Sequence, residues 1–240
     1  FAQYQVLAGM PNLEIKGVSC HIGSQLTDVR PFADALERVS VLVERLRAAG
    51  IKLEVLDLGG GLGITYAQEN PPGPDQYAAA LAERVRKLDM RLVLEPGRVL
   101  VGNAGLLLCQ VHYTKQTPVK RFVIVDGAMN DLIRPSFYDS YHAIWPVRQQ
   151  PGVEPVVADV VGPICETGDY LARDRELPPF RRGDLLAVMS AGAYGFAMSS
   201  NYNSRPRAAE VLVHGDRFSV IRARETLEDL VRGERLPEWM

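Results

Sequence analysis

Three short glycine-bearing segments, each at the end of an apolar run, constrain the fold of this chain more than any other feature. They are Cys20-His21-Ile22-Gly23-Ser24-Gln25, Asp57-Leu58-Gly59-Gly60-Gly61-Leu62-Gly63 and Leu94-Glu95-Pro96-Gly97-Arg98. His21 and Gly59 are 38 residues apart, Gly59 and Glu95 are 36 apart, and a helical pattern fills each interval. Repeated strand–loop–helix units predict a parallel α/β architecture, in which ligands bind at the carboxyl ends of the strands. The spacing therefore predicts a site as well as a fold.

The first hundred residues predict strands at 15–20, 53–58 and 91–94, with an amphipathic helix after each of the first two. The first helix follows Asp28, has Pro31 in its first turn and ends at Gly50, a residue type that commonly stops helices in a left-handed conformation. Pro71-Pro72-Gly73-Pro74 is expected to form a rigid loop. The apolar helix faces are Phe32, Leu36, Val39, Val43 and Leu46 in the first helix, and Tyr77, Leu81, Val85 and Leu88 in the second.

After about residue 104 the pattern changes to short strands separated by glycine and proline turns. Strands are expected at 106–113, 122–125, 156–161, 185–189, 208–213 and 218–221, with no long helix until 225–231. Such punctuation is typical of an antiparallel barrel or sandwich. We therefore expect an α/β domain at 1–104 and a β domain at 105–240.

Composition and charge argue against nucleic-acid-binding, membrane-spanning and disulfide-rich classes of protein. The 240 residues carry 27 basic and 29 acidic side chains, a net charge of −2 with no basic stripe, which argues against nucleic acid as a partner. No apolar run approaches the roughly 20 residues that span a bilayer. Three widely spaced cysteines form no disulfide framework and fit a reducing cytoplasm. The chain opens at Phe1 without an initiator methionine, so we expect further sequence upstream.

The glycines at 59–63 could direct backbone N–H groups at an anion. Ile64 stands where a dinucleotide fingerprint needs glycine, and no Gly-Lys-Ser/Thr ending is present, so the segment is a possible phosphate cradle without a nucleotide signature. A glycine-rich tight turn is the simpler alternative. Glu95 could accept a hydrogen bond from a protonated ring nitrogen, and Arg98 could grip a carboxylate. An ion pair between Glu95 and Arg98 is the alternative there.

Other candidates follow the same strand ends. His21 could stack on a flat cofactor or titrate near neutral pH, or be simply structural. Ser24 could add a hydroxyl to a phosphate. Arg134 and Tyr138 are four residues apart, share a face if helical, and could bind a carboxylate; a surface arginine is the alternative.

The second half adds a thiol and an aromatic segment. Cys165 is a candidate proton donor and Glu166 could bind an ammonium, whereas a buried, apolar cysteine is the usual alternative. Tyr194, among small residues, could donate to a phosphate or a substrate. Asn201, Tyr202 and Asn203 could equally be loop residues that satisfy their own backbone.

Taken together, six ordered motifs resemble one family over roughly residues 15 to 232. They are His-Ile-Gly-Ser-Gln, Gly-Gly-Gly-Leu-Gly, Glu-Pro-Gly-Arg, Asn-Asp-Leu-Ile-Arg-Pro, Cys-Glu-Thr-Gly-Asp and Ala-Tyr-Gly-Phe. Their order resembles the diaminopimelate decarboxylases, pyridoxal-phosphate enzymes of the alanine racemase-like fold. The resemblance implies the last strands, six to eight, of a TIM-like barrel followed by a C-terminal β domain.

The resemblance also implies roles for individual residues. Cofactor-binding residues would be His21 on the ring, Glu95 on the pyridine nitrogen, Gly61, Gly97 and Arg98 on the phosphate, with Ser24, Pro96 and Tyr194. Substrate would contact Arg98, Arg134, Tyr138, Glu166 and Tyr194. Cys165 would be the catalytic proton donor, acting with Glu166 on the neighbouring subunit's site in a head-to-tail homodimer. No metal is implied. The expected reaction converts meso-2,6-diaminopimelate to L-lysine and carbon dioxide.

One departure from the family pattern concerns lysine. The family anchors its cofactor on a lysine of the first barrel strand, and none of Lys16, Lys52, Lys87, Lys115 and Lys120 has that context. We therefore expect this chain to need an N-terminal barrel segment and to be inactive alone. The alternatives are a related pyridoxal-phosphate decarboxylase acting on another basic or dicarboxylic amino acid, and a lysine-less homologue that binds and regulates a partner subunit.

Overall fold

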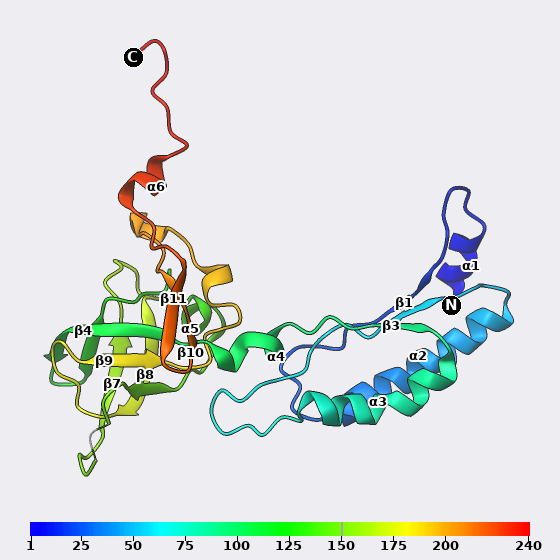
Figure 1. The fold of residues 1–240 in the computed structure, drawn as a ribbon, viewed down its shortest axis with the longest axis horizontal. Coiled ribbons are helices and arrows are strands. Elements are labelled where there is room, and N and C mark those ends of the chain that lie inside the picture. Colours follow the sequence, from blue (N-terminus) through cyan, green and yellow to red (C-terminus); the bar gives the residue numbers. More distant parts are fainter. Residues whose placement is uncertain (150) are drawn as a thin grey trace. The chain divides into compact units, whose positions relative to one another are not determined.

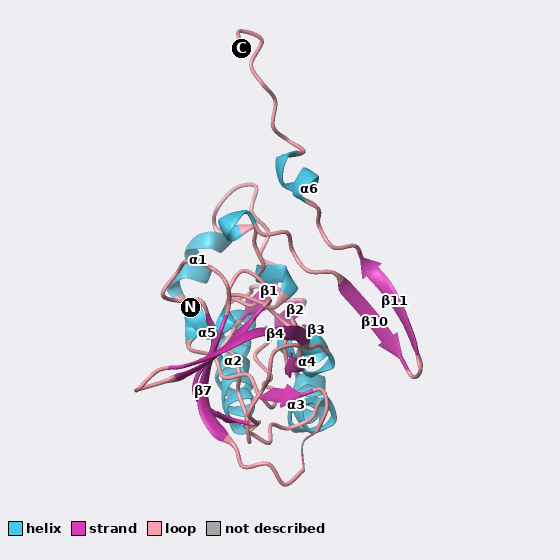
Figure 2. Ribbon diagram, turned by 90° about the vertical axis from the view of Figure 1, so that its left-hand side faces the viewer, coloured by secondary structure: helices cyan, strands magenta, loops and turns pink. Residues whose placement is uncertain are grey.

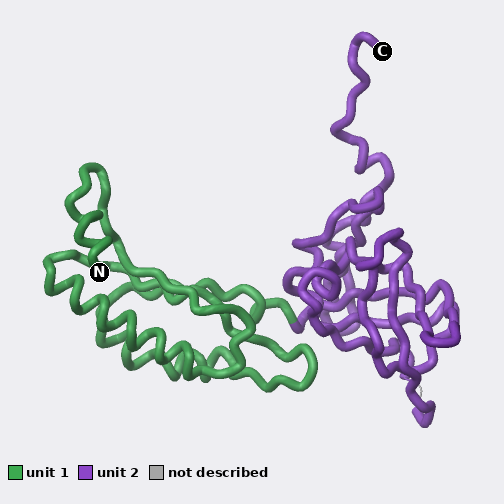
Figure 3. Tube along the Cα trace, turned by 180° about the vertical axis from the view of Figure 1, so that it is seen from behind, with its two compact units in different colours: residues 1–102 green, residues 103–240 purple. Residues whose placement is uncertain are grey.

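The computed structural model describes residues 1–149 and 151–240, which divide into two compact units, 1–102 and 103–240 (Figure 3). The elements of the first unit are α1 (Ala2–Ala8), β1 (Gly17–Ser19), α2 (Arg30–Ala48), β2 (Val55–Asp57), α3 (Pro74–Leu88), β3 (Arg91–Val93) and α4 (Arg98–Val101). A 3₁₀ turn, η1 (Gly102–Ala104), follows.

The sheet of the first unit is parallel, in the order β1-β2-β3, with Val18, Leu56 and Leu92 side by side across the three strands. Helices α2 and α3 lie next to each other along it (Figure 1). The parallel strand–helix alternation predicted from the glycine spacing is confirmed. The ladders are only three residues long, so each strand ends just before its glycine segment.

The faces of α2 and α3 predicted to be apolar pack on this sheet. Phe32, Leu36, Val43 and Leu46 are buried with the strand residue Leu56. Gly50 has φ +82°, the left-handed end expected for α2. The proline-rich loop ends one residue earlier than expected, because Pro74 is the first residue of α3, where its missing N–H costs nothing.

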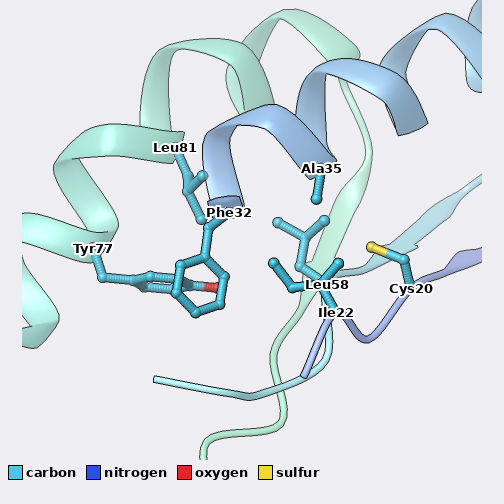
Figure 4. Close-up of a pocket in the computed structure, with 7 residues that line it drawn as sticks. All are labelled: Cys20, Ile22, Phe32, Ala35, Leu58, Tyr77 and Leu81. Atoms are coloured by element: carbon cyan, nitrogen blue, oxygen red, sulfur yellow. The ribbon is translucent and has the colours of Figure 1, made fainter. Parts of the chain in front are cut away.

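The interior between sheet and helices is nearly filled. A cavity of about 10 Å³ remains, lined by Cys20, Ile22, Phe32, Ala35, Leu58, Tyr77 and Leu81. Figure 4 shows the rings of Phe32 and Tyr77 against each other, with centroids 4.9 Å apart. A space of that size scarcely holds one water molecule. This cavity is therefore too small for a cofactor or a substrate.

The second unit is built on a six-stranded sheet in the order β6-β9-β4-β5-β7-β8. Its elements are β4 (Leu107–Gln116), β5 (Arg121–Val125), α5 (Arg134–Tyr138), β6 (Ile144–Pro146), β7 (Val156–Val161), β8 (Tyr170–Leu177), β9 (Leu185–Val188), η2 (Phe196–Met198), η3 (Tyr202–Ser204), β10 (Glu210–His214), β11 (Arg217–Arg222) and α6 (Leu227–Val231). Its core includes Val111, Val160, Leu171 and Leu186.

Two sequence predictions for this unit need correction. The sheet is mixed and not purely antiparallel, because β5 and β7 run parallel, with Phe122 opposite Asp159. Strands β6 and β8 and the short helix α5 were not predicted. The other strands lie where the pattern placed them, within one to three residues at most ends.

Strands β10 and β11 form a separate antiparallel hairpin (Figure 2). The carboxylate of Glu225, just after the hairpin, bonds the backbone and guanidinium of Arg207, just before it. Hydrogen bonds from Arg207 and Asn201 lower the pKa of Glu225 to about 2. The pair thus joins the two ends of the hairpin. Within the described residues, every helix is too short or too polar to cross a membrane.

Candidate functional site

The three glycine segments of the first unit meet at the carboxyl ends of β1, β2 and β3. The Glu95 N–H donates to the carbonyl of Gly59 at 2.8 Å, and the Leu26 N–H donates to the carbonyl of Gly61 at 2.9 Å. A Cβ on Gly60 would lie 2.2 Å from the Glu95 carbonyl oxygen, and one on Gly61 would lie 2.4 Å from that of Gly23. Backbone approaches this close require glycine. The segments that the sequence singled out are therefore one continuous surface.

Arg98 ties this surface together. Its guanidinium donates to the Ser24 hydroxyl at 3.0 Å and to the Tyr66 hydroxyl at 2.5 Å. Arg98 thereby brings a positive charge beside a hydroxyl and the glycine backbone.

The polar groups of this surface remain accessible. His21, Ser24, Glu95 and Gly97 are exposed, whereas Gly59 is buried beneath them. His21 accepts from the Gly60 N–H at 3.4 Å through Nδ1, which fixes its ring beside the glycines. An imidazole face, a carboxylate and a cationic glycine-rich cradle thus share one rim.

Sequence reasoning missed two residues that shape this rim. Gln25 spans the first two segments, donating from Nε2 to the Ile64 carbonyl at 2.6 Å and accepting from the Ile64 N–H at 3.2 Å. Tyr66 holds Arg98 from the far side. Both contacts join positions more than 30 residues apart, and no local pattern marks them.

In the second unit, the loop at 162–169 carries Cys165 and Glu166 on the surface. Its anchor is Asp169, a buried carboxylate that accepts from the Ile164 N–H at 2.6 Å and from the Met129 N–H at 2.8 Å. The Asp169 N–H in turn donates to the Glu166 carbonyl at 3.0 Å. One buried acid therefore fixes both the loop and the segment that leads into α5.

The three thiols differ in their surroundings. Cys165 is exposed, so the alternative of a buried, apolar cysteine does not hold for this residue. The buried cysteine is instead Cys109, where burial raises the thiol pKa to about 12. Burial also raises the pKa of Cys20, with a smaller contribution from Asp57. Cys165 is thus the thiol that a ligand can reach.

Helix α5 carries Arg134 and Tyr138, which meets the condition under which they would share a face, but the two side chains differ in exposure. Arg134 is only 6% exposed, which rules out the surface arginine, while Tyr138 is 58% exposed. The guanidinium bonds the Ser140 hydroxyl at 3.2 Å and His142 at 3.4 Å. The hydroxyl of Ser136 in the same helix donates to the Gly168 carbonyl. Helix α5 and the Cys165 loop are therefore adjacent.

A third segment, 190–202, joins these two. Tyr194 is 41% exposed and has φ +58°, and the neighbouring Gly195 packs where a Cβ would lie 2.2 Å from the Ala191 carbonyl oxygen. The Tyr202 hydroxyl donates to the Glu166 carboxylate at 3.4 Å. Asn201 bonds the Arg205 carbonyl and Glu225, which is the loop role considered for it.

A model of one protein family matches residues 12–192 and is described as pyridoxal-dependent decarboxylase, C-terminal sheet domain. The chain belongs to the pyridoxal-dependent decarboxylases. The diaminopimelate decarboxylase of Pseudomonas aeruginosa is 55% identical over 98% of the chain. The chain spans 56% of that protein's length.

Solved structures resemble the chain to a similar extent. The crystal structure of AQ1208 from Aquifex aeolicus aligns with a TM-score of 0.92 at 50% identity, covering 96% of this chain and 57% of that one. Diaminopimelate decarboxylase from Helicobacter pylori complexed with L-lysine gives 0.87 at 41% identity over 96% of this chain and 57% of that one. This decarboxylase chain is therefore similar to just over half of each relative.

The residues of the first unit fit the cofactor from which the pyridoxal-dependent decarboxylases take their name. At Gly60 and Gly61 there is no space for a side chain, so the backbone itself forms the surface. Ser24 contributes a hydroxyl and Arg98 a positive charge. The His21 ring lies beside these groups. The glycine backbone, the hydroxyl and the positive charge are what a phosphate group needs, and the imidazole ring can stack on a flat cofactor ring.

Lys16 does not lie with the glycine segments. Lys16 precedes β1, at the opposite end of the strand from His21, and pairs with Glu14 and Glu54 at 2.5 and 3.4 Å. The hydrogen bond from Lys16 to Glu14 raises the pKa of Lys16, desolvation opposes that rise, and the hydrogen bond to Glu54 adds to it.

Proposed function

We propose that the protein to which this chain contributes decarboxylates meso-2,6-diaminopimelate to L-lysine and carbon dioxide. The observation that carries the proposal is Arg134, buried and held in place beside the exposed Cys165–Glu166 loop. A substrate with a second carboxylate needs such a cation, and a bidentate arginine is the side chain that binds a carboxylate best. Relatives more than 50% identical that carry this activity in their names support it.

The first unit would hold the cofactor. Gly61, Gly97, Arg98 and Ser24 would bind its phosphate, with Pro96 and Tyr194 completing the contacts. His21 would pack on the ring, and Glu95 would accept a hydrogen bond from the protonated ring nitrogen. When bound, pyridoxal phosphate supplies an electron sink for the charge left by the departing carbon dioxide.

The remaining residues would bind substrate and move one proton. Arg134 and Arg98 would contact substrate carboxylates, Tyr138 would contact the substrate, and Glu166 would bind the distal ammonium. Cys165, accessible and on a fixed loop, donates the proton that replaces the lost carboxyl group.

The domain organisation and the quaternary structure that we propose follow from the resemblance to the same family. We propose that residues 1–104 are the last three strand–helix units of a TIM-like barrel and that residues 105–240 are its C-terminal β domain. An N-terminal barrel segment supplies the anchoring lysine, so the chain alone is inactive. Cys165 and Glu166 act on the partner's site in a head-to-tail homodimer, in the cytoplasm.

The test is carbon dioxide release by the full-length protein, with diaminopimelate compared against ornithine and lysine, which have only one carboxylate. We expect turnover of diaminopimelate alone. Arg134→Ala should raise KM for it about 10- to 100-fold, because hydrogen bonds to charged groups contribute about 1.5–3 kcal/mol. Arg38→Ala, at an exposed position on α2, is the matched control. An unchanged kcat/KM in Arg134→Ala would remove that residue from the site, and turnover of ornithine would favour a related decarboxylase.

A further inference from the structure

His142 is a buried polar residue that the proposed function leaves without a role. Its side chain is 0% exposed, eight residues beyond Arg134 and outside α5. Burying an imidazole is unfavourable unless its two ring nitrogens find partners. Both do here: Nδ1 lies 2.8 Å from the Met189 carbonyl oxygen, and Nε2 lies 3.4 Å from Nη1 of Arg134.

The two partners fix the hydrogen on the ring. A carbonyl oxygen only accepts, so Nδ1 must carry the hydrogen and donate it to Met189. A guanidinium only donates, so Nε2 must present its lone pair to Arg134. His142 is therefore a neutral imidazole in a single tautomer, and it accepts from the Arg134 guanidinium.

The chain returns to Arg134 through a left-handed turn. Asp139, at the end of α5, has φ +51°, which turns the next residues back over the helix. Ser140 then accepts from Nη2 of Arg134 through its hydroxyl at 3.2 Å, two residues before His142. One short segment thus contacts both terminal nitrogens of the same guanidinium.

Strand β8 and the end of β9 hold that segment. The guanidinium of Arg175 donates to the His142 carbonyl at 2.8 Å and lies 3.8 Å from the centre of the Tyr141 ring. The Met189 N–H donates to the Ala143 carbonyl at 2.8 Å. The position of the His142 ring is therefore determined by the sheet and not by a mobile loop.

We propose that His142 is a positioning residue that sets the Arg134 guanidinium for a substrate carboxylate, an inference that rests on the proposed function. The chemistry of the partners supports it. An aspartate or glutamate at this position would neutralise Arg134, whereas a neutral imidazole and a hydroxyl orient the guanidinium and leave its positive charge for the ligand. The carboxylate of L-lysine is the one that Arg134 would hold.

The experiment compares two ligands of the full-length holoenzyme by calorimetry. L-lysine retains the carboxylate, and cadaverine is the same molecule without it. His142→Asn keeps a donor near Met189 but is too short to reach Arg134, so we expect Kd for L-lysine to rise about 5- to 10-fold, the loss of about one hydrogen bond. Kd for cadaverine should stay within twofold. KM for diaminopimelate should rise with kcat nearly unchanged.

His142→Gln tests whether an acceptor for Arg134 is what matters, because the glutamine amide oxygen extends to the position of Nε2. We expect it to restore most of the L-lysine affinity. If His142→Asn does not fold, Ser140→Ala, which removes the contact to Nη2, carries the same comparison.

Equal rises in both dissociation constants would reduce His142 to a structural residue, and no change in either would overturn the proposal. Failure of the wild type to decarboxylate diaminopimelate would instead refute the proposed function, while the binding comparison would still decide the role of His142.

Discussion

At the scale of single residues, the candidate side chains of the two units, each considered by itself, divide between accessible and anchored positions. His21, Glu95, Cys165 and Glu166 are exposed, where a ligand can meet them, whereas Arg134 is buried and its orientation is set by neighbours. Groups that exchange protons or stack on a ring need access. A carboxylate clamp benefits from being preorganised, because less side-chain freedom is lost when the ligand binds.

Cys165→Ala in the full-length enzyme should lower kcat about 100-fold or more, since a positioned general acid contributes roughly 10² to 10⁴. The visible absorbance of the bound cofactor should not change, because the thiol holds no part of it. Cys20→Ala, which alters a thiol facing the filled core, serves as the control. Full activity of Cys165→Ala would exclude the thiol as the proton donor.

The chemically useful residue types near the strand ends could be recognised in the sequence. The residues that hold their segments in place could not. The motifs mark His21, Glu95 and Cys165 because each follows an apolar run. Gln25 and Asp169 escape notice because each acts on backbone groups about 40 residues away, Ile64 and Met129. Such contacts depend on the completed fold, and no spacing within one segment encodes them.

At the scale of elements, the central strands were predictable and the edges were not. β6 and β8 are the two edge strands of the six-stranded sheet. β8 contains the run Arg173-Asp174-Arg175-Glu176, and β6 has only three residues. Charge and shortness protect a sheet edge from pairing with other chains, and they also remove the apolar pattern by which strands are recognised. The parallel pairing of β5 with β7 likewise depends on long-range topology.

Gly60→Ala tests the close contact between two of the glycine segments. The added methyl would lie 2.2 Å from the Glu95 carbonyl oxygen, so the Glu95 segment must move. We expect a loss of about 1–3 kcal/mol in the free energy of unfolding, typical of overpacking, and weaker binding of pyridoxal phosphate. Thermal unfolding and an absorbance titration measure the two effects.

Gly233→Ala is the control for this substitution, because a Cβ there meets nothing within 4 Å and the backbone of Gly233 is not in the left-handed region. It should change stability by less than about 0.5 kcal/mol. Equal changes in stability and in pyridoxal phosphate affinity for the two variants would mean that the glycine segments can move apart and that the cradle is not rigid.

At the scale of the whole molecule, the chain contains two hydrophobic cores. Leu46 belongs to the core of the first unit and Leu186 to that of the second, and both are fully buried. The change in the sequence pattern near residue 104, from helix-length intervals to short strands, is the basis of the domain boundary that we propose. Each core is made from residues of one unit, so each is expected to respond to its own substitutions.

Leu46→Ala and Leu186→Ala should each cost about 2–5 kcal/mol, the usual range for a leucine truncated in a core. Hydrogen exchange of the full-length protein should show lost protection in 1–102 for the first variant and in 103–240 for the second. Loss spread evenly over both ranges in either variant would show that the units unfold as one.

The buried carboxylate of Asp169 has a consequence for redesign of this enzyme family. It bonds the backbone of the Cys165 loop and that of the segment before α5 at the same time. Grafting a foreign 162–169 loop to change substrate range would therefore also disturb the turn that leads to Arg134. The two stretches form a single exchangeable module, and a graft should carry 127–142 and 162–169 together.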